Sequence, residues 1–529
     1  MRTVDKLYKK RSITLCIVFF MLLGFCTFRI LNLQNNSEFR NVADMQFSKT
    51  VTLAKSRGYI YDRNLNPLVN EDKNLRKLLL TDDIKYKSNE SLFEEITPGI
   101  VLSMDDELIM SDGFQEYYDI SRYNDSSLCR HIVGYVDSSD KGVCGIEKAF
   151  DRILADASGK LKINFNSDAS GKVLVGNGIK INDENYDSCA GVILTIDKEI
   201  QGIAENAIIN SDIKCGAAVV IDVNTFEILA LVSIPFYDQN NIENSLNDEN
   251  LPFLNRALCS YPAGSVFKPF VAISALENGY KISNLYECSG HITVNNTDFT
   301  CYNTKSHGKV DLNKAIEKSC NTFFINLGIN LGAEKLIKTL SAFGFGKEIK
   351  LCSTIISDKG NIPPSDSILS DAQLANLCFG QGEILVTPVQ LAAAYAVLAN
   401  GGTYIEPTVL KELMDDDGDI YATYRPETKY QVTDEEICQA VNSALYNNML
   451  NGTGINASSE IVFSAGKTAT AQTGRYDENG QEQLVTWFAG FFPFDDPKYA
   501  VVVMNEKGST ASIDCAPVFK NIMEKIMLT

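Results

Sequence analysis

The chain is poor in histidine and in positive charge. Its 529 residues include three histidines, and 48 lysines and arginines stand against 67 aspartates and glutamates, so the formal net charge is −19. This balance disfavours a nucleic-acid-binding protein, which needs a basic surface. No internal repeat or long low-complexity tract is present. With 45% apolar residues, the chain is expected to form packed domains rather than a disordered or repetitive structure.

The scarcity of histidine limits the chemistry that the chain can perform. His131, His291 and His307 do not stand at the spacing of metal ligands, so zinc hydrolases with an H-E-x-x-H motif are excluded. The sequence predicts neither a metal site nor a cofactor. A Ser-His-Asp triad would have to use one of these three residues, so a nucleophile in this chain is expected to use another base.

The 14 cysteines are too few for a disulfide-rich scaffold, and none belongs to a C-x-x-C pair. Cys288 and Cys301 flank a short segment. In an oxidising compartment they could form a disulfide. In a reducing one they would be small buried apolar residues. The sequence leaves both interpretations open.

One long uncharged apolar stretch, from Ser12 to Phe28, lies near the N-terminus. With the apolar residues that follow, it is long enough to cross a bilayer. No small-x-small cleavage site follows, so a membrane anchor is favoured over a cleavable signal peptide. Basic residues before the stretch predict a cytoplasmic N-terminus. We expect a cytoplasmic tail over 1–11, a single transmembrane helix over 12–31 and the rest outside the cytoplasm.

The remainder divides in two by composition. Residues 32–190 are polar and turn-rich with short strand-like runs, which predicts an extended β-rich domain. Residues 191–529 have clearer periods, with strand runs, then helices, then strands again. This order predicts an α+β domain in which helices pack on an antiparallel sheet.

The strongest catalytic candidate is Ser265-Val-Phe-Lys268. One helical turn separates the two residues, so a hydroxyl and an amine share one face and the amine can accept the hydroxyl proton. Tyr261-Pro-Ala-Gly precedes the serine and predicts a helix start there, where the helix dipole favours developing negative charge. The same Ser-x-x-Lys spacing lacks this context at four other serines: Ser138, Ser211, Ser306 and Ser464.

Two further clusters carry suitable groups. Ser319-Cys-Asn321 lies between two helical runs and offers a second hydroxyl for proton transfer and an amide to hold a peptide. Residues 465–472 are expected to form a strand on which a cation and threonines could bind a carboxylate. Each triplet alone is most simply a set of surface polar residues, and only the three together point to a site.

The three clusters resemble the S-x-x-K, S-x-N and K-T-G motifs of penicillin-binding proteins and β-lactamases. Further stretches are similar to class B (monofunctional) penicillin-binding proteins, the D,D-transpeptidases of peptidoglycan synthesis: Arg57–Asn64, Gly142–Glu147, Leu194–Asp197, Tyr261–Ser265, His307–Gly308, Phe379–Gln390, Gly452–Gly454 and Trp487–Gly490. The resemblance implies a penicillin-binding transpeptidase domain over 191–529, preceded by a non-catalytic pedestal domain over 32–190.

The resemblance also implies roles for individual residues. Ser265 would attack the peptide bond between two D-alanines of a stem peptide, with Lys268 as base and Ser319 transferring a proton. An amine of a second stem peptide would then resolve the acyl-enzyme and form the crosslink. Asn321 would hold the substrate amide. The terminal carboxylate would be bound by three residues of the third motif: Lys467, Thr468 and Thr470.

The third motif departs from the family pattern, because Ala469 stands where the family has glycine. An added methyl could crowd a substrate lying along the strand, so we expect acylation to be retained but altered. A second departure is Phe226, at a hairpin turn where glycine is usual, and we expect it to matter only for structure.

The implied partners are stem peptides, β-lactams and a SEDS-type glycan polymerase in the membrane, and no nucleic acid. Two other functions compete with an active transpeptidase. One is a catalytically weak scaffold that activates a partner polymerase, and the other is a membrane-anchored β-lactam sensor or β-lactamase. A β-lactam sensor or β-lactamase has no use for a pedestal of this length.

Overall fold

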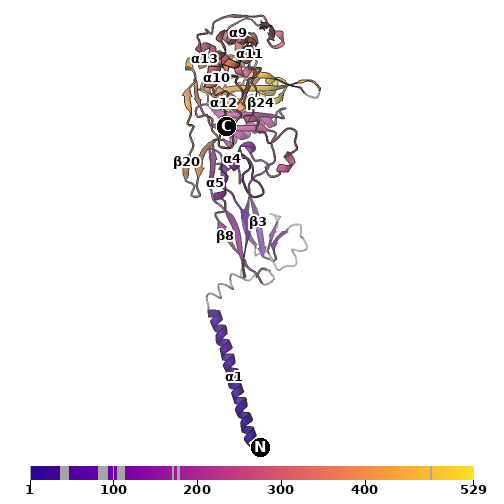
Figure 1. Ribbon diagram of the computed structural model, residues 1–529, viewed down its shortest axis with the longest axis vertical. Helices are drawn as coiled ribbons and strands as arrows, with labels where there is room; N and C mark the ends of the chain where they lie inside the picture. Colours follow the sequence, from indigo (N-terminus) through magenta and orange to yellow (C-terminus); the bar gives the residue numbers. More distant parts are fainter. Residues whose placement is uncertain are drawn as a thin grey trace. The chain divides into compact units, whose positions relative to one another are not determined.

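The computed structural model describes residues 2–35, 47–80, 93–98, 100–103, 114–168, 172–174, 179–476 and 479–529. These residues form two compact units, between which the chain passes several times. The first unit consists of Met1–Ser56, Lys73–Ile120 and Ser158–Asp187, and the second of Arg57–Asp72, Ser121–Ala157 and Ser188–Thr529. Figure 1 labels helices and strands of both units.

The first unit begins with a long helix, α1 (Arg2–Asn35). Its segment Val4–Asn35 has a mean hydropathy of 2.3 over its most apolar window and is long enough to cross a membrane. The predicted anchor over 12–31 lies within this helix. Among the residues that the structure describes, α1 is the one helix that meets these requirements of length and composition.

Two small sheets make up the rest of the first unit. One has the strand order β1-β7-β8 and the other β4-β5-β3-β6. Buried side chains such as Ile163 and Phe165 of β7 pack with Leu78 and Ile100, so that apolar residues from both sheets share one small core. The strand bounds are β1 (Ser48–Lys55), β3 (Asp72–Leu80), β4 (Phe93–Thr97), β5 (Ile100–Ser103), β6 (Phe114–Ser121), β7 (Lys160–Asn166) and β8 (Lys180–Glu184).

The second unit is built on a five-stranded antiparallel sheet with the order β11-β10-β24-β23-β22. The strands come from the two ends of the unit's longest segment and meet where β10 pairs with β24 (Figure 1). Their bounds are β10 (Gly216–Asp222), β11 (Ile228–Ile234), β22 (Ala465–Tyr476), β23 (Glu482–Phe492) and β24 (Tyr499–Gly508).

Both faces of this sheet are covered, which explains why its strands are apolar without alternation. Along β10, Ala217, Val219 and Ile221 belong to one hydrophobic cluster. Ala218 and Val220, which point the opposite way, belong to another. The first cluster includes α7 (Lys268–Glu277) and α12 (Pro388–Ala399), and the second includes α6 (Lys198–Ile209) and α15 (Ala516–Leu528).

Shorter elements complete the second unit. A four-stranded sheet has the order β2-β9-β19-β20, and the remaining strands pair two by two. The strands are β2 (Tyr59–Tyr61), β9 (Gly191–Leu194), β12 (Tyr261–Pro262), β13 (Tyr286–Cys288), β14 (His291–Val294), β15 (Thr297–Thr300), β16 (Gly308–Val310), β17 (Leu385–Val386), β18 (Thr403–Ile405), β19 (Leu410–Met414), β20 (Ile420–Thr423) and β21 (Lys429–Gln431). The helices are α3 (Arg130–Val133), α4 (Gly145–Ala149), α5 (Asp151–Asp156), α8 (Leu312–Glu317), α9 (Asn321–Leu331), α10 (Ala333–Ala342), α11 (Asp371–Cys378), α13 (Glu435–Asn451) and α14 (Ala511–Asp514).

The α+β architecture with helices on an antiparallel sheet is as predicted. The β10–β11 hairpin has Phe226 at φ 59°, a left-handed conformation that favours glycine. The phenylalanine is nonetheless fully buried and packs edge-on against Tyr404. This apolar contact offsets the backbone strain, in agreement with the structural role expected for the residue.

Candidate functional site

Ser265 lies on a 3-10 turn, η5 (Gly264–Phe267), which leads directly into α7. Pro269 occupies the first turn of α7, where a missing N–H removes no helical hydrogen bond. Gly264 has φ 61° and donates its N–H to the carbonyl of Gly380 at 2.7 Å. The predicted position of the serine at a helix start is therefore confirmed.

Two buried side chains hold the backbone on either side of the serine. Tyr395 of α12 donates its hydroxyl to the carbonyl of Val266 at 3.1 Å. The single tryptophan, Trp487 of β23, donates its indole N–H to the carbonyl of Pro262 at 2.9 Å. The turn that carries the candidate nucleophile is thus fixed to both the sheet and the helix that covers it.

Lys268 is fully buried and connects the first two motifs. Its ammonium donates to the carbonyl and hydroxyl of Ser319 at 2.8 and 3.1 Å, and to Oδ1 of Asn321 at 2.7 Å. The Ser319 hydroxyl donates to Oγ of Ser265 at 3.0 Å. Lys268 therefore reaches Ser265 through Ser319, whereas the sequence had suggested a contact between neighbours on one helix face.

Burial lowers the pKa of Lys268 to about 8, because the protein interior solvates the ammonium poorly. The ammonium also lies 5.7 Å from the ring centroid of Phe324, an aromatic residue that the sequence analysis did not single out. A lysine with this pKa is neutral in a substantial fraction of molecules near pH 8. It can therefore accept a proton, as a general base must.

Ser319 and Asn321 occupy the junction between α8 and α9, as predicted. Ser319 has φ 53°, a conformation that is costly for a residue with a Cβ and is often found at functional sites. Asn321 donates its amide to the carbonyl of Thr300 at 2.9 Å while its oxygen accepts from Lys268. Both polar groups are thereby held toward Lys268.

The third motif lies on β22, an edge strand of the sheet. Lys467 is fully buried, and burial together with the nearby Lys268 lowers its pKa well below the usual value. Thr470 is exposed and its hydroxyl accepts from the backbone N–H of Ala511 at 3.3 Å. A Cβ built on Gly264 would lie 3.1 Å from Cβ of Ala471, so the turn carrying Ser265 packs against this strand.

Thr453 is a site residue that the sequence analysis missed. Its hydroxyl accepts from Nζ of Lys467 at 3.1 Å and from the hydroxyl of Thr468 at 2.7 Å. It is itself held by the buried Asn448, whose Oδ1 accepts from the Thr453 hydroxyl at 3.1 Å. The Gly-Thr-Gly stretch at 452–454 was the available signal, but nothing in the sequence connected it with the third motif.

The Ala469 side chain points away from the exposed side of β22. It is only 2% exposed and belongs to the apolar core, on the side of the strand that faces Gly264. Thr470, next along the strand, is exposed. The methyl group that distinguishes this motif from the family pattern is therefore buried against the protein.

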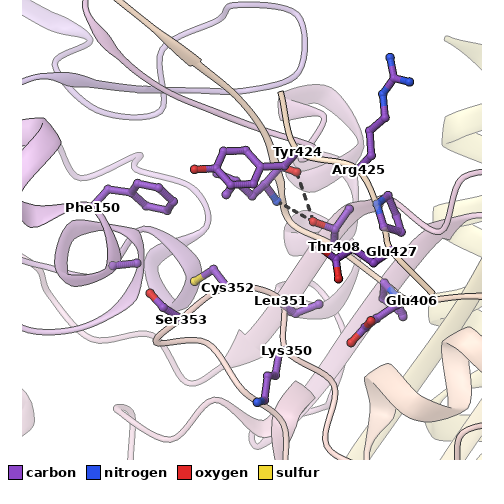
Figure 2. A pocket seen from close by; sticks show the side chains of 14 residues that line it. Phe150, Lys350, Leu351, Cys352, Ser353, Glu406, Thr408, Tyr424, Arg425 and Glu427 are labelled. Atoms are coloured by element: carbon purple, nitrogen blue, oxygen red, sulfur yellow. Dashed lines mark hydrogen bonds between the residues drawn. The ribbon is translucent and has the colours of Figure 1, made fainter. Parts of the chain in front are cut away.

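A cavity of about 440 Å³ elsewhere in the second unit shares no residue with these motifs. Figure 2 shows Phe150, Cys352, Thr408 and Tyr424 around it. Its Thr408 hydroxyl accepts from the backbone N–H of Leu410 at 3.2 Å, which is an ordinary loop contact. We assign no role to this cavity.

The antiparallel sheet is covered by helices on both faces and the Ser265 turn packs against its edge strand, which agrees with the penicillin-binding transpeptidase domain that the three motifs imply. The family model of the penicillin binding protein transpeptidase domain matches residues 216–524, and the chain belongs to this family. The resemblance drawn from the motifs is thereby confirmed.

Individual relatives agree with this assignment. The chain is 28% identical to stage V sporulation protein D of Bacillus subtilis over 96% of this chain and 84% of that protein. It is 27% identical to the peptidoglycan D,D-transpeptidase MrdA of Haemophilus influenzae over 77% of this chain and 66% of that protein. A solved structure of a peptidoglycan synthase complex contains a chain with a TM-score of 0.71 and 22% identity, covering 97% of this chain and 98% of that one. That last likeness shows the shared fold.

Proposed function

We propose that this protein is a serine-type peptidoglycan D,D-transpeptidase that crosslinks stem peptides. The hydrogen-bonded path from Lys268 through Ser319 to Ser265 is the observation that carries this proposal. A buried amine with a lowered pKa at one end and a hydroxyl at the other are the components of an activated nucleophile. The family and the relative named as a D,D-transpeptidase support the choice of substrate.

In the proposed acylation step, Ser265 Oγ attacks the carbonyl between two D-alanines. Ser319 accepts the proton of Ser265 and donates its own hydroxyl proton to neutral Lys268. The same two transfers in the opposite direction protonate the departing D-alanine. An oxyanion hole formed by the backbone N–H groups of Ser265 and Thr470 would stabilise the tetrahedral intermediate, where each donor is worth about 10²–10³ in rate. The products are a Ser265 ester and free D-alanine.

In the second step an amine of another stem peptide attacks the ester and restores the Ser265 hydroxyl. We propose that Asn321 orients the substrate amide and that Lys467, Thr468 and Thr470 bind its terminal carboxylate. The buried Ala469 methyl supports retention of this carboxylate site. β-Lactams, which mimic the substrate, should form a stable ester with Ser265.

Labelling with a fluorescent penicillin tests this proposal. The wild-type protein should take up label that survives denaturation, and Ser265→Ala should remain unlabelled while keeping its unfolding temperature. Absence of label on the folded wild type would favour the scaffold. Rapid release of hydrolysed penicillin would favour a β-lactamase.

We further propose that α1 anchors the protein with its N-terminus in the cytoplasm and the second unit outside, and that residues 32–190 act as a pedestal for residues 191–529. The five basic residues before the apolar stretch support this orientation. A polymerase of the SEDS type is the proposed membrane partner of α1. Replacing α1 with an unrelated membrane helix should abolish co-purification with such a polymerase while penicillin labelling persists.

A further inference from the structure

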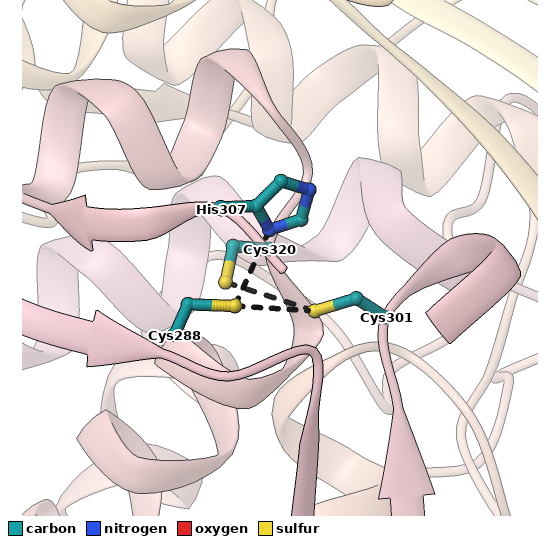
Figure 3. Close-up of side chains that lie close together, drawn as sticks. All are labelled: Cys288, Cys301, His307 and Cys320. Carbon is teal, nitrogen blue, oxygen red and sulfur yellow. Dashed lines mark hydrogen bonds between the residues drawn. The ribbon is translucent and has the colours of Figure 1, made fainter. Parts of the chain in front are cut away.

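Three cysteines and a histidine converge beside the second catalytic motif. They are Cys288, Cys301, His307 and Cys320, here called the Cys3His cluster. All four ligand atoms lie within 4.8 Å of one another, and Figure 3 shows the sulfurs and the imidazole Nδ1 facing a common point. The cluster does not depend on the transpeptidase activity, and none of its members was assigned a role in it.

The spacing within the Cys3His cluster matches a tetrahedral metal shell. Sγ of Cys301 is 3.8 Å from Sγ of Cys288 and 3.8 Å from Sγ of Cys320, and Nδ1 of His307 is 3.4 Å from Sγ of Cys288. Tetrahedral zinc, with bonds of about 2.3 Å to sulfur and about 2.0 Å to nitrogen, holds two sulfurs about 3.8 Å apart and sulfur and nitrogen about 3.5 Å apart.

The surroundings also suit a metal. The three cysteines are at most 1% exposed and are free thiols, and His307 is partly buried. The buried Thr322 donates its hydroxyl to Sγ of Cys288 at 3.2 Å and lies 3.4 Å from Sγ of Cys320. Hydroxyl donors to ligating sulfurs are a usual feature of the layer around a metal site.

Cysteines that served only as small apolar residues would not need a histidine nitrogen among them. A disulfide between Cys288 and Cys301, the other interpretation of the sequence, would leave Cys320 and His307 without a purpose in the cluster. A metal uses all four groups at once. Its binding would release the thiol protons to solvent and change no oxidation state.

We propose that the Cys3His cluster binds one zinc ion as a closed, structural site. Three thiolates and one imidazole fill the four positions, so none remains for a catalytic water. The metal would link the segment 288–307 to Cys320, which stands between Ser319 and Asn321. It would thereby support the backbone that positions both polar groups of the second motif.

Metal analysis of the full-length protein in detergent, after incubation with Zn²⁺ and removal of the excess, tests the proposal. The wild type should retain about one zinc per chain, and Cys301→Ser and His307→Ala should each retain about a tenth of that or less. Two control variants should bind zinc as the wild type does: Cys438→Ser, at a buried cysteine elsewhere, and His291→Ala, at an exposed histidine between Cys288 and Cys301.

A second measurement protects the test against variants that misfold. The wild-type protein loaded with Co²⁺ should show thiolate-to-metal charge-transfer absorption and the visible bands of tetrahedral cobalt, and Zn²⁺ should bleach both. Absence of metal and of these bands in the wild type would overturn the proposal. So would a Cys288–Cys301 disulfide in the zinc-treated protein, or undiminished zinc in Cys301→Ser. Penicillin labelling, measured in parallel, reports separately on the proposed function.

Discussion

At the scale of single residues, the surroundings of Lys268 set the protonation state of the amine that serves as the proposed base. It is buried without a carboxylate partner, and its contacts are the carbonyl, hydroxyl and amide oxygens of Ser319 and Asn321. Because burial lowers its pKa to about 8, the group is protonated at acidic pH and neutral in alkaline solution. Its state therefore changes within an accessible pH range.

The rate of acylation by penicillin should consequently rise from pH 6, reach half its maximum at an apparent pKa of about 8 and level off above about pH 9. Stopped-time labelling across this range measures it. Lys268→Ala should lose about 10²–10⁴ in rate on the alkaline plateau and should not show the rise with pH. Lys281→Ala, at an exposed lysine, serves as the control and should keep the wild-type profile. A flat profile for the wild type would contradict the role of Lys268 as base.

Ala469→Gly tests the departure in the third motif. Because the methyl group is 2% exposed and faces the core, its removal should change the penicillin acylation rate less than about threefold. The free energy of unfolding should fall by about 0.5–1 kcal/mol, since glycine loses more backbone freedom than alanine in a strand. Urea unfolding and labelling of the same samples measure both. A large gain in acylation would mean that the methyl does crowd the substrate.

At the scale of elements, β22 and the end of α13 are joined through Thr453. Its hydroxyl contacts Lys467 and Thr468, so it aligns two proposed carboxylate-binding groups. Thr453→Val keeps the shape of the side chain and removes these bonds. Penicillin acylation should slow about tenfold, because each lost hydrogen bond is worth about 1 kcal/mol. Thr473→Val, further along β22, is a comparison that should label normally.

A buried ionic network in the second unit joins segments that precede Ser265 in the chain. Glu147 is fully buried and accepts from Arg57 at 2.9 Å and from Arg122 at 2.7 Å. Glu147→Ala would leave Arg122 without a carboxylate and Arg57 with Asp151 as its remaining one, which should cost about 3–5 kcal/mol of unfolding free energy. Denaturant titration checks this value.

The matched comparison is the exposed pair Arg152–Asp156, with its side chains 94% and 75% exposed. Arg152→Ala should change stability by no more than about 0.5 kcal/mol, because solvent screens such pairs. Equal effects of the two substitutions would show that burial does not govern the network.

At the scale of the whole molecule, the proposed membrane attachment through α1 is separate in the chain from the proposed catalytic residues. A chain starting after Asn35 should move from the membrane to the soluble fraction, because the apolar segment is lost. It should still label with penicillin, since every proposed catalytic residue lies in the second unit. Ultracentrifugation and labelling of the two fractions measure these outcomes. A truncated chain that stays with membranes would reveal a second attachment.

Local signals were sufficient for much of the fold. A threonine followed by proline is a local signal for a helix start, and at the start of α12 the structure contains the full capping box between Thr387 and Gln390. The β10–β11 hairpin, the helix junction at Ser319 and the apolar N-terminal helix were also predictable, because each depends on neighbours in the chain. The division into two interleaved units was not, since it depends on contacts between distant segments.

The sequence by itself determined the α+β class, the apolar N-terminal helix and the three motifs, because periodicity, capping and spacing are properties of short segments. Only the tertiary structure decided that Lys268 reaches Ser265 through Ser319, that Ala469 faces the core and that Thr453 supports the third motif. It alone brought His307 among three cysteines spread over residues 288–320. These relations depend on packing between separate elements of the chain, which sets distances and burial that spacing in the sequence cannot express.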